Sequence, residues 1–367
     1  MIKWKTVVFI SVFILAACGF YPTGSVQQAS ADSNYDNWAI LGYKASSIAQ
    51  RALGKSYGLI VLTDAGYVEV NGLSTIGVVD GITRSLPVGI GDKTLVLVHR
   101  DVFKPLWFAF YDPASGKCAY LELISDAVKG KTDFSRLPPS VFRGPVVERI
   151  DAQYLISHAS EFDRMASQKV FGGNEFSIVT IANAAALGVP DYVMNSVTFH
   201  DHYCPGVTSG ILMANWAKKN FPPLPGGSYF VQSVDPWCKE DALQIMLNTT
   251  PGKKGYAVTY PTSDDKAKWR ADVKNASTIL YRQNPSTQQW EGVVLGFTFA
   301  TSNTGCESIT SATVQRLCLD LWYLNYLETP ERFVSKLYEF TLPTGTTPQA
   351  LARPGVDPMK ELGLTTQ

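Results

Sequence analysis

The sequence predicts an α+β protein made of two similar units in series, the second of which carries the functional site. Its 367 residues are enough for two domains of ordinary size. An apolar content of 46%, with 12% aromatic residues, is sufficient for packed cores and argues against a disordered chain. The same order of elements (helix, strand, helix, three strands) is predicted in both halves. We therefore expect units at 36–171 and 172–345, followed by a C-terminal tail at 346–367.

In the first unit, apolar periodicity predicts helices, and runs rich in Val, Leu, Phe and Tyr that are bounded by turns predict strands. The predicted helices are 39–53 and 73–86, and the predicted strands are 57–63, 93–99, 106–111 and 118–124. A long helix is predicted from Pro139 to about Val170. Gly172 and Gly173 then mark the boundary between the units.

The second unit repeats this order. The predicted helices are 207–220, 239–247 and 309–327, and the predicted strands are 229–234, 256–260, 278–282 and 290–299. Thr329 and Pro330 supply the N-cap and the first position of one more helix, which ends at Tyr338.

The most informative stretch is 198–206, because it holds two of the four histidines and one of the six cysteines within five residues. Pro205 suits the first position of a helix, where its missing N–H is not needed. Cys204 is then the N-cap, where orphan N–H groups and the helix dipole favour a thiolate. A single cysteine at a helix start is more often a packed core residue. The nearby imidazoles of His200 and His202 instead favour a reactive or metal-binding corner.

This stretch and the segment after it resemble the FmdE family, named for molybdenum formylmethanofuran dehydrogenase. The family pattern His-x-His-x-Cys-Pro-Gly stands at 200–206, Cys-x-x-Asp-Ala-x-Gln at 238–244, and Thr-x-Gly-Lys at 250–253. Two departures are Asp201, where the family often has glycine, and Asn248-Thr249, where it often has Gly-Cys. The resemblance implies an α+β core, often dimeric, with a metal or thiol site near the histidines and cysteines. The family name comes from an operon and does not specify an activity.

Together, these residues predict a site for a transition metal or a metal-bearing cofactor. The expected ligands are His200, His202, Cys204 and Cys238. Thiolates with imidazoles suit borderline-soft ions, so zinc is expected and nickel is the alternative. Four further residues are candidates for orienting a ligand or binding a cofactor or anion: Asp241, Gln244, Gly252 and Lys253. Helix capping, core hydrogen bonding or a solvated turn would explain these four equally well.

A weak internal repeat relates the two units. Its anchor points pair Gly42 with Gly206, the helix of Asp80 with that of Asp241, and the turn after Tyr111 with the turn after Tyr281. In this alignment the first unit has Asp36, Trp38, Ile40 and Gly77 or Val78 where the second has its predicted ligands. We interpret the first unit as a degenerate partner domain that replaces one subunit of a dimer and walls the site. A homodimer and an unrelated first domain are the alternatives.

Two other functions fit the same residues. One is a thiol-dependent enzyme with Cys204 as nucleophile or redox thiol and His202 as base. The other is a receptor that captures a metal or cofactor for an importer. Basic and acidic residues number 32 each without basic runs, which argues against a nucleic-acid partner. The sequence has no Gly-rich nucleotide loop and no Gly-x-Ser-x-Gly, which argues against nucleotide-dependent catalysis and serine hydrolysis.

The N-terminus predicts export. Residues 1–17 have the charged start and short apolar stretch of a signal peptide. Residues 15–19 (Leu-Ala-Ala-Cys-Gly) look like a lipobox, so Cys18 would carry a lipid and 18–35 would be a flexible tether. This predicts a protein anchored to the membrane outside the cytoplasm. Cleavage after Ala31 would instead give a soluble secreted or periplasmic protein.

With the signal removed and Cys18 carrying the lipid, five cysteines remain, so at least one thiol lacks an intramolecular disulfide partner. Cys306 and Cys318 are the expected disulfide, with two buried free thiols as the alternative. Cys204 and Cys238 are either a redox pair or two ligands of one metal. The sequence leaves both choices open.

Overall fold

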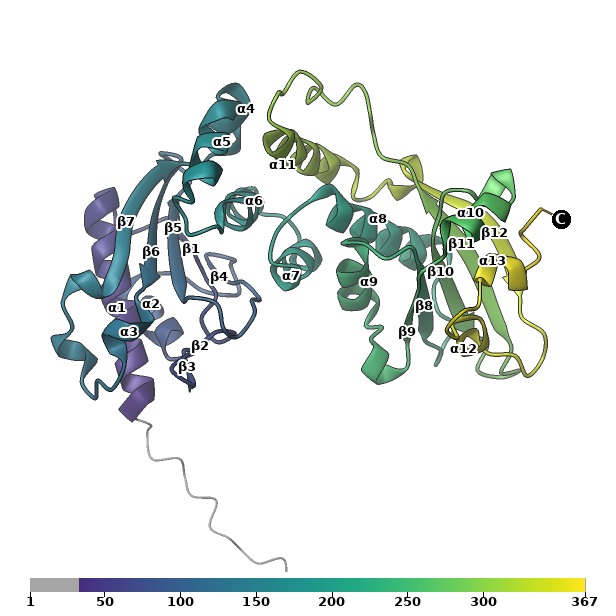
Figure 1. Cartoon of the computed structure of the whole chain (residues 1–367), viewed down its shortest axis with the longest axis horizontal. Coiled ribbons are helices and arrows are strands. Elements are labelled where there is room, and N and C mark those ends of the chain that lie inside the picture. The colour runs from purple at the N-terminus through teal and green to yellow at the C-terminus, as the bar shows by residue number, and fades with distance from the viewer. Residues whose placement is uncertain (1–32, 367) are drawn as a thin grey trace, which may run out of the picture.

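Two five-stranded sheets organise the chain in the computed structural model, which describes residues 33–366 (Figure 1). The predicted signal peptide and the predicted tether up to residue 32 therefore lie outside the described residues, and the last three residues of that tether, 33–35, already belong to helix α1 (Ser33–Leu53). The first sheet has the order β4 (Leu95–Leu97), β1 (Ile60–Thr63), β5 (Trp107–Asp112), β6 (Lys117–Leu123) and β7 (Phe142–Arg149). Only β4 and β1 pair in parallel. A small hairpin of β2 (Glu69–Val70) and β3 (Leu73–Ser74) lies beside it.

The second sheet has the same topology. Its order is β9 (Tyr256–Thr259), β8 (Tyr229–Val234), β10 (Ala276–Gln283), β11 (Trp290–Phe297) and β12 (Val334–Thr341). Here too only the first two strands, β9 and β8, pair in parallel. Each strand of one sheet thus has a counterpart of the same polarity in the other. The predicted α+β fold of two similar units is confirmed.

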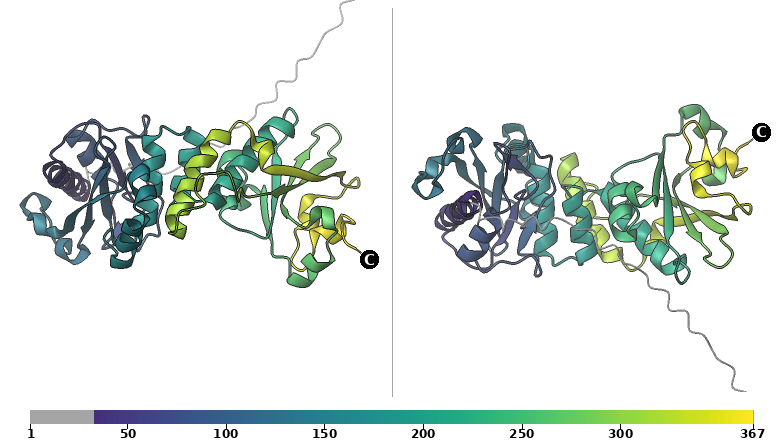
Figure 2. Two further views of the ribbon diagram at one scale, coloured as in Figure 1. Left: turned by 90° about the horizontal axis from the view of Figure 1, so that it is seen from above. Right: turned by 90° about the horizontal axis from the view of Figure 1, so that it is seen from below.

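A layer of helices separates the two sheets (Figure 2). Its members are α4 (Ala152–Ser157), α5 (Ala159–Gln168), α6 (Glu175–Ala186), α7 (Asp191–Phe199), α8 (Pro205–Asn220), α9 (Lys239–Leu247) and α11 (Ala312–Tyr323). One apolar core runs from the inner face of the first sheet through these helices to the second sheet. Helix α6 is buried over most of its length, which explains why its sequence is apolar on all sides. The division predicted at 171/172 stays a prediction, because the units share this core.

Further helices cover the outer faces of the sheets. Helices α1 (Ser33–Leu53), α2 (Val78–Ser85) and α3 (Ser125–Val128) belong to the first unit, and α10 (Ser263–Lys268), α12 (Pro348–Leu351) and α13 (Pro358–Glu361) to the second. The predicted tail is therefore folded, because Leu351, Met359 and Leu364 are buried against the second sheet. No helix within residues 33–366 is both long and apolar enough to cross a membrane.

Two predicted helices are wrong, at the same place in each unit. The helix predicted from Pro139 is a 3-10 turn (Pro139–Val141) followed by β7, α4 and α5. The helix predicted from Pro330 is a 3-10 turn (Pro330–Arg332) followed by β12. In both, the proline begins a single turn and not a helix. Both strands lie at a sheet edge and have mostly exposed or half-buried side chains, so they lack the apolar run of a buried strand.

The structure also shifts the alignment of the two units by one helical turn. Gly42 on α1 presses against Val78, the first residue of α2, and Gly210 on α8 presses against Lys239, the first residue of α9. Gly42 therefore corresponds to Gly210 and not to Gly206. By the same shift, the first-unit counterpart of Cys204 is the exposed Asp36, and that of Cys238 is Gly77. That the units arose by duplication stays a prediction.

The expected disulfide joins Cys306, in the segment before α11, to Cys318 within that helix. Cys118 is a free, fully buried thiol in β6. Because the disulfide closes a loop across a separation of 12 residues, its main effect is to restrict the unfolded chain.

We predict that Cys306→Ser with Cys318→Ser lowers the free energy of unfolding by about 3 kcal/mol. For a chain of this size the melting temperature should fall by roughly 4 °C, measured by circular dichroism. Reduction of the wild-type disulfide should give a similar shift. An unchanged melting temperature in both experiments would contradict the prediction.

Candidate metal centre

Three helix ends meet at one point between the sheets. His200 is the C-cap of α7, Cys204 is the N-cap of α8, and Cys238 is the N-cap of α9. His202 lies in the short loop that joins α7 to α8. Pro205 occupies the first position of α8, as predicted. Both cysteines therefore lie at the positive end of a helix dipole.

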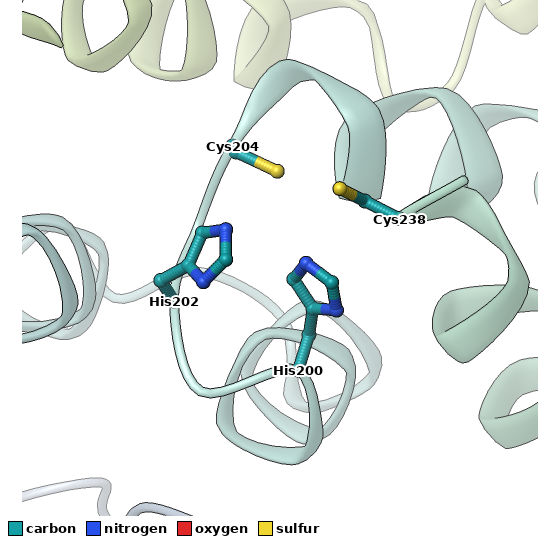
Figure 3. Close-up of side chains that lie close together, drawn as sticks. All are labelled: His200, His202, Cys204 and Cys238. Atoms are coloured by element: carbon teal, nitrogen blue, oxygen red, sulfur yellow. The ribbon is translucent and has the colours of Figure 1, made fainter.

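The structure brings together all four ligands that the sequence predicted, and their side chains point toward one another (Figure 3). One nitrogen of each histidine and the sulfur of each cysteine all lie within 4.8 Å of one another. A tetrahedral ion with Zn–N near 2.0 Å and Zn–S near 2.3 Å would hold such atoms roughly 3.3–3.8 Å apart. Small side-chain movements therefore suffice to enclose an ion. Within residues 33–366 this is the one group of three or more His, Cys, Asp or Glu residues with such spacing.

A carboxylate holds each imidazole ring. The Nδ1 of His200 lies 2.6 Å from Oδ2 of Asp241, and the Nδ1 of His202 lies 2.8 Å from Oδ1 of Asp201. With Nδ1–H donated to a carboxylate, Nε2 keeps its lone pair and can bind a metal. The Nε2 of His200 is buried and has no hydrogen-bond partner among the described residues. A buried polar atom of this kind is costly unless it gains a ligand, so the donor set fits a metal ion.

Asp201 is a site residue that was not predicted from the sequence, where it stands only as a departure from the family motif. Its backbone φ is +65°, a conformation that glycine adopts freely and aspartate tolerates better than most residues. Its role could have been predicted from its chemistry, because it is a carboxylate directly before His202, a candidate metal-binding histidine.

The other predicted site residues divide in two. Asp241 lies in the first turn of α9 and contacts His200, and Gln244 lies one turn further along this helix. Gly252 and Lys253 follow the far end of the nine-residue helix, which is about 14 Å long. The Lys253 ammonium donates to Asn248 there. The structure does not bring Gly252 and Lys253 to the His–Cys cluster, and a cofactor-binding role for them stays a prediction.

The electrostatics favour one thiolate in the metal-free cluster. The neighbouring Cys204 thiol and both imidazoles stabilise the Cys238 thiolate and hold the pKa of Cys238 well below its usual range, although burial opposes the charge. The Cys238 thiolate and burial raise the pKa of Cys204. The helix start was expected to favour a thiolate at Cys204, but the more exposed Cys238 holds the charge.

The histidines respond to that charge. Burial opposes protonation of His200, but Asp241 and the Cys238 thiolate outweigh it and raise the pKa of His200 to about 9. The pKa of His202 is also raised: burial again opposes the charge, and Asp201 and Cys238 favour it. A metal would therefore displace protons on binding, so its affinity should fall with decreasing pH.

Two glycines let the helix ends approach. A Cβ on Gly206 would lie 2.7 Å from Cβ and 3.1 Å from Sγ of Cys238, and a Cβ on Gly210 would overlap the backbone of Lys239. The spacing Gly206-x-x-x-Gly210 places both on one face of α8. The glycine of the Cys-Pro-Gly motif is thus required by the position of Cys238.

Comparison with known proteins agrees with this geometry. The family model for FmdE, described as molybdenum formylmethanofuran dehydrogenase operon, matches residues 199–304. The predicted resemblance is confirmed for this segment, which contains all four cluster residues and less than a third of the chain. No curated protein matches the chain.

We predict that Gly210→Ala destabilises the protein by about 1–3 kcal/mol, because the added methyl group forces α8 and α9 apart. This should outweigh the gain of up to about 1 kcal/mol that alanine brings to a helix. Gly252→Ala, where a Cβ meets open space, is the control and should stay within about 0.5 kcal/mol of wild type. Equal stability of the two variants in urea unfolding would contradict the prediction.

We also predict that Cys238 is the reactive thiol of the metal-free protein. Its alkylation by iodoacetamide should change little between pH 6 and 8, whereas an ordinary thiol accelerates about tenfold per pH unit in this range. Mass spectrometry of the peptides, after treatment with a chelator, measures the rate at each cysteine. Faster labelling of Cys204 than of Cys238, or a tenfold rise per pH unit at Cys238, would contradict this prediction.

Proposed function

We propose that this protein binds one transition-metal ion, with zinc as the expected ion and nickel as the alternative, through His200, His202, Cys204 and Cys238. The observation that carries the proposal is the convergence of two nitrogens and two sulfurs, with each imidazole oriented by a carboxylate. Zinc prefers four nitrogen and sulfur donors in tetrahedral geometry, and two thiolates neutralise its charge. Because the two thiolates would neutralise its charge, a divalent ion can be held in this half-buried cluster.

The donor set favours holding an ion over hydrolysing a substrate. Catalytic zinc sites keep one coordination position open for water or substrate, whereas four protein donors close the site. Cys204 is buried, but the His202 side chain is 27% exposed and Cys238 is half-buried. An ion can therefore reach the cluster from solvent. We infer capture or storage of the ion, which includes the role of a metal-capturing receptor for an importer.

We further propose that this binding takes place outside the cytoplasm, with the protein tethered to the membrane through Cys18. The lipobox at 15–19 supports the anchor. The disulfide between Cys306 and Cys318 supports an oxidising compartment, since such bonds are rare in the cytosol. The alternative is the same protein in soluble, secreted form.

A second candidate function is thiol chemistry. Its support is the lowered pKa of Cys238, which is half-buried and lies beside a second thiol and two imidazoles. In this version Cys238, and not Cys204, is the nucleophile, with His202 as base. Alternatively, Cys204 and Cys238 act as a redox pair.

The experiment that tests the metal proposal is elemental analysis of the purified, tag-free protein after zinc loading and dialysis. We expect about one metal per chain in wild type and its loss in Cys204→Ala and in Cys238→Ala, because each variant removes one of four donors. Cys118→Ala removes a buried free thiol of β6 that is not part of the cluster and should keep the metal.

A wild-type protein without metal would refute the proposal and leave thiol chemistry as the working hypothesis. Equal loss in Cys118→Ala would show that the variants act through general destabilisation.

A further inference from the structure

The loop that carries both histidines is clamped by the first unit, which has no metal ligands of its own among the described residues. His99 and Arg100 come after β4 and lie against this loop. The backbone N–H of His99 donates to the carbonyl of Thr198 at 3.0 Å. The His99 ring stacks on Phe199 with centroids 5.3 Å apart and planes 12° apart. The first unit therefore contacts the last turn of α7, which leads into the loop, through both a backbone hydrogen bond and a stacked ring.

The Arg100 guanidinium adds an ionic contact between the two units. Its Nη1 donates to Oδ2 of Asp201 at 2.9 Å, and its Nη2 donates to Oδ1 of Asn174 at 2.7 Å. The Arg100 side chain is 17% exposed and that of Asp201 is 37% exposed, so solvent screens part of this ion pair. The Asn174 amide lies within hydrogen-bond distance of Tyr120, which in turn bonds to Glu122 in the first sheet. The guanidinium is thus held by Asn174 at the start of α6, which is itself linked to the first sheet through Tyr120.

Asp201 uses both carboxylate oxygens at once. Oδ1 accepts from Nδ1 of His202, and Oδ2 accepts from Arg100. The backbone at this position has φ of +65°, which favours glycine over a residue with a side chain. A carboxylate here is therefore retained at some cost in backbone strain, and its two contacts account for its presence.

We propose that Arg100 is a positioning residue for the metal centre: it fixes Asp201, and Asp201 fixes the His202 imidazole with Nε2 directed into the cluster. This inference rests on the proposed function. The first unit, which lacks ligands, would thereby supply an essential contact of the site. Hydrogen-bond partners of metal-binding histidines commonly change metal affinity by 10–100-fold when they are removed.

The other histidine provides an internal control. His200 is held by Asp241, and both belong to the second unit. Loss of Arg100 should therefore disturb the His202 side of the site and leave the His200 side intact. If Arg100 acts through Asp201 alone, the loss of Arg100 and the loss of Asp241 should change the free energy of metal binding independently.

The test is a pair of double-mutant cycles on the purified full-length protein, with Zn²⁺ affinity measured by competition with a chromophoric chelator. Asp201→Asn keeps a residue that tolerates positive φ but removes the charge. We expect Arg100→Gln and Asp201→Asn each to weaken Zn²⁺ binding by about tenfold, toward the lower end of the range for such partners. The double variant should be no weaker than Asp201→Asn alone. In the second cycle, the fold losses of Zn²⁺ affinity caused by Arg100→Gln and by Asp241→Asn should instead multiply in the double variant.

Arg84→Gln is the matched control, because Arg84 is an exposed first-unit arginine with its own carboxylate partner, Asp80. It should bind Zn²⁺ as wild type does. The visible absorption of bound Co²⁺ reports the geometry of the ligands. It should change in Arg100→Gln, and Arg100→Lys should restore part of it because lysine keeps one charged donor to Asp201.

Two results would overturn the inference: Zn²⁺ affinity of Arg100→Gln within twofold of wild type, or multiplication of the Arg100→Gln and Asp201→Asn effects. If circular dichroism shows that Arg100→Gln is unfolded, the cycle of Arg100→Lys with Asp201→Asn decides: multiplication of these two effects on Zn²⁺ affinity would overturn the inference. Failure of the wild type to bind Zn²⁺ would instead refute the proposed function, so the two failures are distinguishable.

Discussion

The close crossing of α8 and α9 is the constraint on which the candidate site depends. Gly206 and Gly210 present no side chain to α9, so the start of that helix can lie directly against α8. Because the N-cap of each helix is a cysteine, the crossing brings two sulfurs together at two positive helix ends. The histidines then need only a short loop to reach the same point. A side chain at either glycine would separate the sulfurs before it affected the histidines.

The first unit has a similar close packing of two helices, α1 and α2, but without the His and Cys side chains. There the small residues lie on both helices. Gly77, the N-cap of α2, and Gly81 within α2 lie against α1, and Gly42 of α1 lies against the backbone of Val78 in α2. The packing of the two helices is retained, but Asp36 and Gly77 stand where the cysteines would be. Close helix packing and metal-binding side chains are therefore separable properties of this fold. The second unit has both, and the first contributes packing and the Arg100 contact.

The features that could be predicted from the sequence are those that short stretches of residues determine by themselves. The central strands were predicted because both of their faces are buried and their residues are apolar, as in 107–111. The four-residue cluster was predicted because its ligands stand in compact motifs at helix starts. The edge strands β7 and β12 were missed, since they lack that apolar run and each follows a proline that also suits a helix start. Arg100 could not be predicted, because 101 residues separate it from Asp201 and only tertiary packing brings them together.

The charges of the cluster bear on how a metal ion would enter and leave the proposed site. In the metal-free state, the lowered pKa of Cys238 favours a thiolate, and the raised pKa values of His200 and His202 favour an imidazolium beside it, so opposite charges face each other. A divalent ion with two thiolates and two neutral imidazoles would be neutral overall. Binding would therefore release protons from the cluster. Because an uncompensated charge in a half-buried position is costly, charge compensation both with and without the ion would favour reversible exchange of protons for metal, which fits the proposed capture.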